Sequence, residues 1–226
     1  MSTKQHAQNR AAERPAARSS STRATVQLRD LVPFVVRWSG ERDALMPMVV
    51  RKGGRGIGYA DERSFDRDGE GVLWTRVPSQ PGKGTPEFGK VHTLRQRLCM
   101  AELRCQICGG PADRSPSGVL WLIDADPSEL RPGDERTAHP PVCRPCAIRS
   151  TTACPHLRPA FTALRVRAFL PYGVTGALYA PARPMPVTVN AGQFRLGDPH
   201  LPWVRATQLL LTLTDFTVID PDDPAA

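Results

Sequence analysis

Four cysteines in the middle of the chain form two pairs with the same spacing. Cys105 and Cys108 lie in Cys-Gln-Ile-Cys-Gly-Gly, and Cys143 and Cys146 lie in Cys-Arg-Pro-Cys-Ala-Ile-Arg. The two glycines after the first pair allow a tight turn that directs backbone amides towards the sulfurs, as in a zinc knuckle. The second pair is predicted to lie in the first turn of a helix, where the helix dipole favours the thiolate form of cysteine. Together the pairs supply the four sulfur ligands of a closed tetrahedral site, so we predict one structural zinc ion, Zn2+.

Two other uses of these cysteines have to be weighed against zinc. They could be unliganded thiols, or one pair could be a redox-active dithiol. Neither pair follows a clear β-strand in a βαβ unit, which is the setting of a redox Cys-x-x-Cys motif. Zinc is therefore the favoured interpretation, and a site with four sulfur ligands performs no reaction itself.

A second metal site is a separate hypothesis. Its ligands would be Cys99, Cys154 and His156 together with His92. The alternative for Cys99 is a buried thiol, because it lies on a predicted apolar helix.

The segment before the first cysteine pair must position it. Apolar residues from Val91 to Leu103 recur at about helical spacing and predict a helix that runs directly into Cys105, with Arg95 on another face. The pattern Asp-Arg-x-x-x-Gly-Val-Leu-Trp occurs twice, at 66–74 and 113–121, and predicts a tight turn followed by an apolar strand each time.

Strand signals lie on both sides of this central segment. The runs 46–50 and 57–59 predict two strands joined by a glycine-rich basic loop. After the second cysteine pair, 164–179 predicts strands broken at Pro171-Tyr-Gly, and 185–190 predicts another. Residues 203–213 suit either a helix that begins after Pro202 or a buried strand; we favour the helix, followed by a last short strand at 216–219.

Length and composition bound the fold. With 226 residues, 23 prolines and 18 glycines, the chain predicts an α+β fold with short strands, few helices and many loops around a small zinc-stabilised centre. We expect a disordered basic arm at 1–27, an α+β domain at 28–219 with a zinc module at about 98–156, and a disordered acidic tail at 220–226.

The chain offers no signal for a membrane or for secretion. It has no apolar stretch of the ~18 residues that a membrane span needs, and its first residues contain no apolar core of a signal peptide. We therefore expect a cytoplasmic protein with reduced cysteines and no membrane partner.

The order of motifs resembles that of a known zinc fold. A knuckle, a strand-rich insert and a Cys-x-x-Cys that opens a helix resemble the treble-clef domain of HNH endonucleases over about 98–156. That family places a catalytic histidine beside an aspartate in the strand after the knuckle and a metal-binding histidine later. This chain has Ala125 after Asp124 and has Ala147 after the second pair. The resemblance therefore implies a degenerate HNH-like module that lacks the catalytic histidines.

A nuclease remains an alternative because acidic residues stand near these positions. Asp124 and Asp126 with His139 could rebuild a divalent-metal site, since carboxylates and imidazole suit Mg2+ or Mn2+. The competing interpretations are a capped turn around Pro127 and a loop histidine.

The distribution of charge indicates a polyanionic partner. The net charge is +8, and residues 1–29 carry +5 of it, from six basic residues and Glu13. The segment 142–197 contains seven arginines and no acid, which predicts an arginine surface that contacts phosphates. The predicted nucleic-acid-binding residues are Arg144, Arg149, Arg158, Arg165 and Arg167, joined by Arg51, Lys52 and Arg55 of the glycine-rich loop.

Two further explanations compete with nucleic-acid binding. A GC-rich genome would favour arginine, and 26 of the 30 basic residues are arginine. A treble-clef domain can also serve as a platform for a protein partner, with exposed tryptophans as anchors, although the four tryptophans stand in apolar runs that suit a core. The sequence thus favours a non-catalytic zinc protein that binds nucleic acid, in a regulatory or mobile-element role, and indicates no small-molecule substrate.

Overall fold

The described part of the molecule is mostly β-structure with two α-helices. The computed structural model describes residues 32–43, 46–153 and 161–220. Its elements in chain order are β1 (Val36–Trp38), β2 (Met48–Val50), β3 (Ile57–Tyr59), η1 (Ser64–Asp66), β4 (Leu73–Trp74), β5 (Pro86–Val91), α2 (Thr93–Glu102), β6 (Arg114–Ser115), β7 (Gly118–Ile123), β8 (Glu135–Thr137), α3 (Arg144–Ala153), β9 (Thr162–Ala180), β10 (Val187–Arg195), η3 (Leu201–Trp203) and β11 (Val204–Ile219). The predicted α+β class is confirmed.

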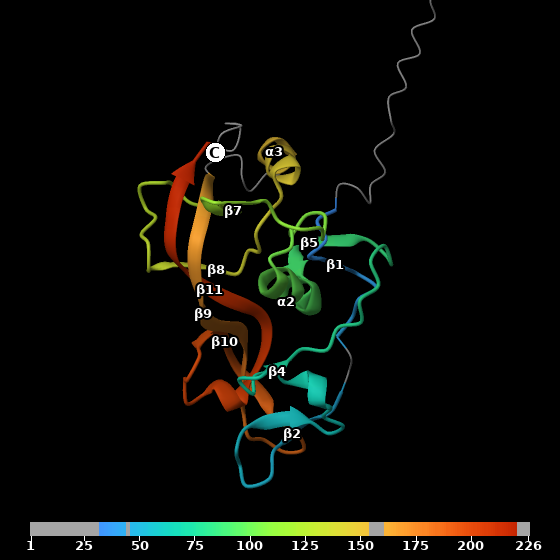
Figure 1. The fold of residues 1–226 in the computed structure, drawn as a ribbon. Helices are drawn as coiled ribbons and strands as arrows, with labels where there is room; N and C mark the ends of the chain where they lie inside the picture. Colours follow the sequence, from blue (N-terminus) through green and yellow to red (C-terminus); the bar gives the residue numbers. More distant parts are fainter. Residues whose placement is uncertain (1–31, 44–45, 154–160, 221–226) are drawn as a thin grey trace, which may run out of the picture.

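Two long antiparallel strands, β9 and β11, run through the molecule and join its two ends (Figure 1). They belong to a seven-stranded sheet with the order β4-β11-β9-β7-β6, to which β8 adds beside β11 and β10 beside β9. Strand β7 pairs with the first part of β9 and β10 pairs with its last part. The pairs β1–β5 and β2–β3 form two small antiparallel sheets of their own.

The predicted break at Pro171 is wrong, because β9 is continuous through it. On the side of β9 away from β11, β7 pairs with Thr162–Val166 and β10 with Gly173–Ala180, so Pro171 falls between these two partner strands. A proline lacks the amide hydrogen that a sheet requires and is tolerated where the ladder is interrupted. The register between β9 and β11 also shifts at Leu210 and Leu211, opposite the proline.

The helix favoured at 203–213 is also wrong: Trp203 ends η3, and the rest of this segment is the first part of β11. The strand pairs with β9 along one side, while β4 and β8 pair with parts of its other side. Its alternation of Thr, Leu and Val suits a half-buried strand, so pairing with β9 outweighs a weak local helical tendency.

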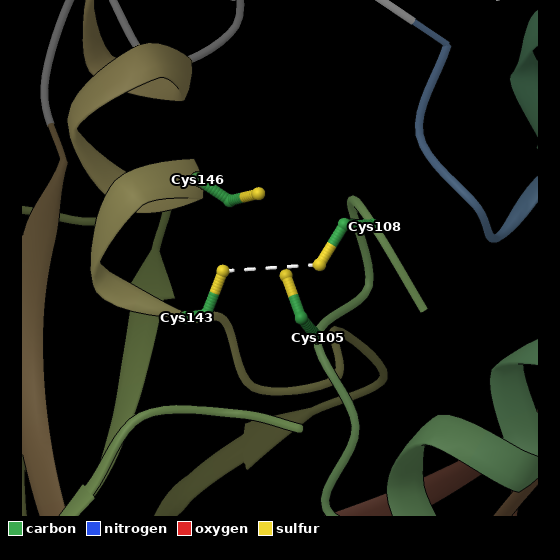
Figure 2. A group of neighbouring side chains, drawn as sticks. All are labelled: Cys105, Cys108, Cys143 and Cys146. Atoms are coloured by element: carbon green, nitrogen blue, oxygen red, sulfur yellow. Dashed lines mark hydrogen bonds between the residues drawn. The ribbon is translucent and has the colours of Figure 1, made fainter. Parts of the chain in front are cut away.

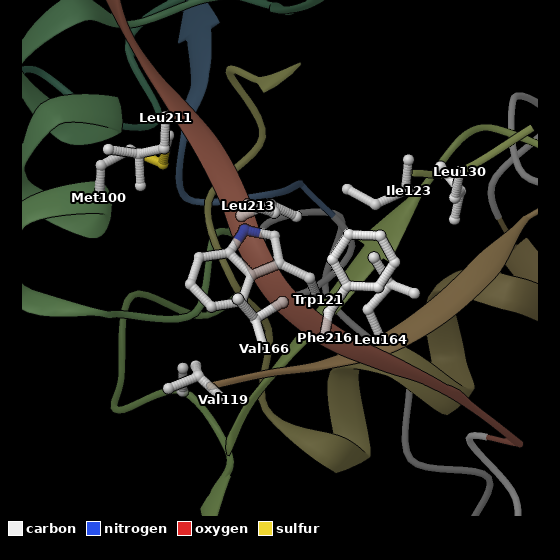
Figure 3. Packing of buried hydrophobic residues seen from close by; sticks show 11 residues of the cluster. Met100, Val119, Trp121, Ile123, Leu130, Leu164, Val166, Leu211, Leu213 and Phe216 are labelled. Carbon is white, nitrogen blue, oxygen red and sulfur yellow. The ribbon is translucent and has the colours of Figure 1, made fainter. Parts of the chain in front are cut away.

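The main hydrophobic core lies where β7, β9 and β11 meet α2. Trp121 is fully buried at its centre, with Leu164, Leu213 and Phe216 from the sheet and Met100 from the helix (Figure 3). The Trp121 indole Nε1 donates a hydrogen bond to the His139 carbonyl at 2.9 Å. Trp38 and Trp74 are also buried and Trp203 is half-buried, so the core role expected of the tryptophans is confirmed for the three buried ones.

Several other local predictions are confirmed. The runs 46–50 and 57–59 form the antiparallel hairpin β2–β3. Both copies of the repeated pattern lead into a strand, β4 and β7, but β4 pairs parallel to β11 and β7 pairs antiparallel to β9. Local sequence therefore specifies turn and strand, while the partner depends on the rest of the sheet.

Helix α2 is present as predicted, but its buried face differs from the apolar one. Leu94 is 53% exposed, whereas Arg95 is 2% exposed. Arg95 donates from Nη1 and Nη2 to the two carboxylate oxygens of buried Glu41, at 2.6 and 2.7 Å. Part of the packing of this helix is thus an internal ion pair, which the spacing of apolar residues in the sequence does not indicate. Across the described residues, no helix combines the length and apolar character needed to cross a membrane.

Candidate metal centre

The knuckle forms where α2 ends. Leu103 adopts a left-handed conformation with φ of 52° and caps the helix by donating its amide to the Cys99 carbonyl. The chain then turns tightly: the Cys105 amide donates a hydrogen bond to the Gly110 carbonyl at 2.7 Å, and the Gly109 amide donates one to the Cys105 carbonyl at 2.8 Å. Gly109 has φ of +74°, a conformation that favours glycine. The glycines therefore shape the loop that carries the first pair.

The second cysteine pair occupies the start of α3, as predicted. Cys143 directly precedes the helix, and its carbonyl accepts hydrogen bonds from the amides of Cys146 and Ala147 at 3.0 and 2.9 Å. The two sulfurs therefore lie within one helical turn.

Backbone hydrogen bonds hold the two pairs next to each other. The Gln106 amide donates to Pro141 at 2.9 Å, and the Asp113 amide donates to Val142 at 3.0 Å. The chain before β1 also contacts the knuckle, because the Phe34 amide donates a hydrogen bond to the Ile107 carbonyl at 2.8 Å. Three segments that are distant in sequence thus position the sulfurs through main-chain contacts, independently of any ion.

The four sulfurs lie where one tetrahedral ion would hold them. All lie within 4.8 Å of one another, and Cys108 Sγ is 3.8 Å from Cys143 Sγ (Figure 2). Zn–S bonds of about 2.3 Å in a tetrahedron separate the sulfurs by about 3.8 Å. The predicted cluster is confirmed, and its donor set and spacing fit one zinc ion.

The surroundings affect the four thiols unequally. Burial raises the pKa of Cys105 and of Cys143 to about 11, and it also raises the pKa of Cys146. At Cys108 burial acts in the same direction, but the Gly110 amide and the neighbouring cysteines outweigh it and lower the pKa. A metal ion bound here would have to displace protons from buried thiols, so its affinity would rise with pH.

Arg149 stands beside this cluster on α3. Its Nη2 is 3.0 Å from Cys146 Sγ, and this hydrogen bond raises the pKa of Arg149. The predicted phosphate contact is thus a neighbour of the four candidate metal ligands. The three-residue spacing on one helix is the signal that could have revealed it.

The residues of the proposed second metal site do not form a cluster in the described part of the chain. Cys99 is buried, its Sγ faces the Cys105 carbonyl at 3.8 Å, and burial raises its pKa to about 12. His92 caps α2, since its Nδ1 accepts from the Arg95 amide at 3.4 Å, and its Nε2 lies 3.3 Å from the Pro78 carbonyl. Cys154 and His156 lie outside the described residues.

Of the acidic residues considered for a nuclease site, Asp126 caps a turn. Asp126 Oδ1 accepts hydrogen bonds from both the amide and the hydroxyl of Ser128, at 2.8 and 2.6 Å, as expected for a capped turn. Asp124 and His139 do not join it in a metal-binding group; within the described residues the four cysteines form the candidate group.

The single arginine surface predicted for 142–197 needs correction. Arg165 is buried and its Nη1 donates to Asp113 at 2.5 Å. Arg167 forms two hydrogen bonds with Asp215, at 2.7 and 2.6 Å. Both aspartates lie outside the acid-free window, so the fold supplies counter-charges that the linear sequence does not show. Arg144 is half-buried.

The other predicted basic residues do not extend that surface. Arg51, Lys52 and Arg55 are exposed in the β2–β3 loop, at the end of the molecule far from α3 (Figure 1). Arg158 lies outside the described residues. The predicted basic residues that the structure describes are thus divided between two ends.

Sequence reasoning also missed the buried cluster around Glu41. Burial acts to raise the pKa of Glu41, but hydrogen bonds from Arg95 and from the amides of Trp38 and Gln80 outweigh it and lower the pKa to about 2. Arg95 further donates to the Val36 carbonyl at 2.8 Å and to Ser79 at 2.9 Å. This cluster ties β1, the chain before β5 and α2 into one support for the knuckle, and no motif marks it.

Comparison with family models, with curated proteins and with solved structures found no match to the chain.

Proposed function

We propose that the protein is a non-catalytic zinc-binding protein that binds nucleic acid. The observation that carries the zinc part is the approach of four sulfurs from two distant turns to within 4.8 Å of one another. A closed set of four sulfur ligands leaves no open coordination position for a substrate, so the ion would act structurally.

The order of elements around the cysteines supports a treble-clef-like module. The knuckle follows α2, the hairpin β6–β7 comes next, and the second pair opens α3. The positions at which HNH nucleases carry their histidines hold Ala125 and Ala147, whose side chains cannot transfer a proton or bind a metal. This arrangement supports a module that retains structure and has lost catalysis.

The charge distribution supports nucleic acid as the partner. Residues 1–29 carry +5, and the β2–β3 loop carries three exposed cations without an acid. Cations that are not paired within the protein can release counterions when they neutralise phosphates, which is the main sequence-independent source of affinity for nucleic acid.

Metal analysis and a binding assay test the two parts separately. We expect one zinc per chain in freshly purified, reduced protein, and retention on DNA or RNA that weakens steeply as salt rises. Absence of stoichiometric zinc would refute the first part. Metal-dependent cleavage of nucleic acid that is lost in Asp124→Ala would replace the second part with a divergent HNH-like nuclease.

A protein-interaction module is the second candidate, and strand β10 favours it. This strand pairs with β9 on one side, and its Val187 and Val189 are 49% and 56% exposed. Exposed apolar side chains on an outer strand can pair with an extended segment of another protein. Binding of this kind would show little dependence on salt, in contrast to binding of nucleic acid.

A further inference from the structure

The tip of the β2–β3 hairpin presents three basic side chains around one cavity. The loop 51–56 reads Arg-Lys-Gly-Gly-Arg-Gly. Arg51, Lys52 and Arg55 are all exposed, and they line a surface cavity of about 290 Å3. Three cations that face one cavity form a local positive field suited to an anion.

The backbone of the loop is shaped by its own hydrogen bonds and by glycine. The Arg51 amide donates to Gly56 at 2.8 Å, and the Gly54 amide donates to Arg51 at 3.0 Å. Gly53 and Gly54 have φ of +78° and +67°, conformations that other residues rarely adopt. A side chain at Gly54 would meet no atom within 4 Å. Glycine is therefore favoured at this position by the backbone conformation and not by lack of space. Without a side chain, Gly54 leaves the main chain of the loop accessible to a ligand.

The base of the hairpin is anchored in the protein. Met48, Ile57 and Tyr59 pack in a buried cluster with Leu73 and Tyr179. Where the loop meets the body, Gly56 lies so close to Pro202 that an added Cβ would be 2.3 Å from its carbonyl oxygen. The three cations thus project from a fixed support.

Nearby acids do not neutralise the tip, because other arginines already bind them. Arg76 Nη1 is 3.0 Å from both carboxylate oxygens of Asp61. Arg67 holds Glu62 with hydrogen bonds of 2.7 and 3.0 Å. Arg51 acts on Glu62 only through its charge, which contributes to lowering the pKa of Glu62.

We propose that this cavity binds backbone phosphates of a nucleic acid, with the β2–β3 loop, residues 51–56, placed against a groove of the duplex. The proposal rests on the proposed function and assigns its phosphate contacts to Arg51, Lys52 and Arg55. Guanidinium groups match phosphate oxygens in a forked geometry, and a lysine adds a point charge. A hairpin with cations at its tip and a buried base has the shape for this contact.

The experiment compares two triple variants of the full chain that remove the same charge. Arg51→Ala/Lys52→Ala/Arg55→Ala removes the tip cations, and Lys90→Ala/Arg114→Ala/Arg131→Ala removes three exposed cations elsewhere. Binding of fluorescein-labelled duplex DNA, single-stranded DNA and RNA is followed by fluorescence anisotropy over a range of salt. Zinc content and thermal unfolding confirm that each variant is folded.

We expect the tip variant to bind duplex DNA roughly tenfold or more weakly at low salt, and to show a salt slope smaller by about two to three. The control variant should change binding much less. If RNA or single-stranded DNA shows the larger loss, the phosphate site stands and the groove placement is wrong. Equal losses in both variants, or unchanged binding by the tip variant, overturn the phosphate site while the proposed function survives. If the wild-type chain binds no nucleic acid, this phosphate site and the nucleic-acid part of the proposed function both fail.

Discussion

The two ends of the molecule use charge in opposite ways. At the cysteine end, which comprises the knuckle, α3 and the Glu41 cluster, several ionic groups are buried or lie against one another. Glu41 is paired with Arg95, Arg165 with Asp113, and Arg149 with Cys146 Sγ. At the hairpin tip, three exposed cations surround a cavity, and the nearest acids are bound by other arginines.

This difference separates charges that build the fold from charges that are available to a ligand. Burying a charge without a partner costs several kcal/mol, so interior charges must be compensated within the protein. An exposed cation costs little to leave unpaired, because water solvates it. The net charge of the chain is therefore a poor guide to a binding surface until the pairs inside the fold are known.

Loss of one of the four clustered cysteines should have the largest effect of any change considered. We expect Cys105→Ser to abolish stoichiometric zinc and to lower the free energy of unfolding by about 5 kcal/mol or more, because metal binding and folding are coupled. Zinc analysis and chemical denaturation measure both effects. Cys99→Ala is the matched control, since Cys99 is buried beside the knuckle without being one of the four clustered cysteines; loss of zinc in this variant would contradict the assignment.

Breaking the buried ion pair should be the next largest effect. Arg95→Met leaves the carboxylate of Glu41 buried without its main partner, which should cost about 3–5 kcal/mol of stability. Denaturant unfolding measures this cost. The double variant Glu41→Gln/Arg95→Met should recover part of this cost, because it removes the orphaned charge. If the double variant is destabilised by the sum of the two single variants, the two side chains are not energetically coupled and the ion-pair explanation is wrong.

The same pair predicts acid sensitivity. The pKa of Glu41 falls from its ordinary 4.5 to about 2 on folding. Because the folded-state pKa is depressed, this contribution is present above pH 4.5 and is lost as the pH falls towards 2, for a total of about 3 kcal/mol. Unfolding curves between these pH values should show the loss in the wild type and a smaller one in Glu41→Gln. Parallel curves for the two proteins would contradict the assignment.

The exposed pair Arg167–Asp215 gives a contrast with the buried one. Both side chains are more than 40% exposed, so Arg167→Ala should change the free energy of unfolding by less than about 1 kcal/mol. A cost as large as that of Arg95→Met would show that exposure does not separate the two kinds of pair.

Substitution at the hairpin tip should have the smallest effect on stability. Arg51→Ala/Lys52→Ala/Arg55→Ala should leave the free energy of unfolding within about 0.5 kcal/mol of the wild type, because the base of the hairpin carries the packing. Thermal unfolding measures this. A large destabilisation would mean that the tip serves the fold rather than a ligand.

Local patterns determined several parts of this protein directly. The Cys-x-x-Cys pairs predicted the cluster, because their spacing places two sulfurs on one turn wherever that turn lies. The glycine-rich loop predicted the hairpin β2–β3, and the residues from Val91 to Leu103 predicted most of α2. Each cysteine turn, the hairpin and the helix depend on interactions between residues close in sequence, whereas the meeting of the two cysteine turns depends on contacts such as Gln106–Pro141.

Tertiary structure decided the rest, because it depends on partners far away in the chain. Residues 203–213 form a strand because β9 lies beside them, and β9 continues through Pro171 because its partners on that side stop short of it. Arg165 is neutralised by Asp113, 52 positions away, and Arg95 by Glu41, 54 positions away. Long-range pairing of strands and of charges leaves no periodic signal in the sequence, so only the folded chain shows which cations remain for a partner.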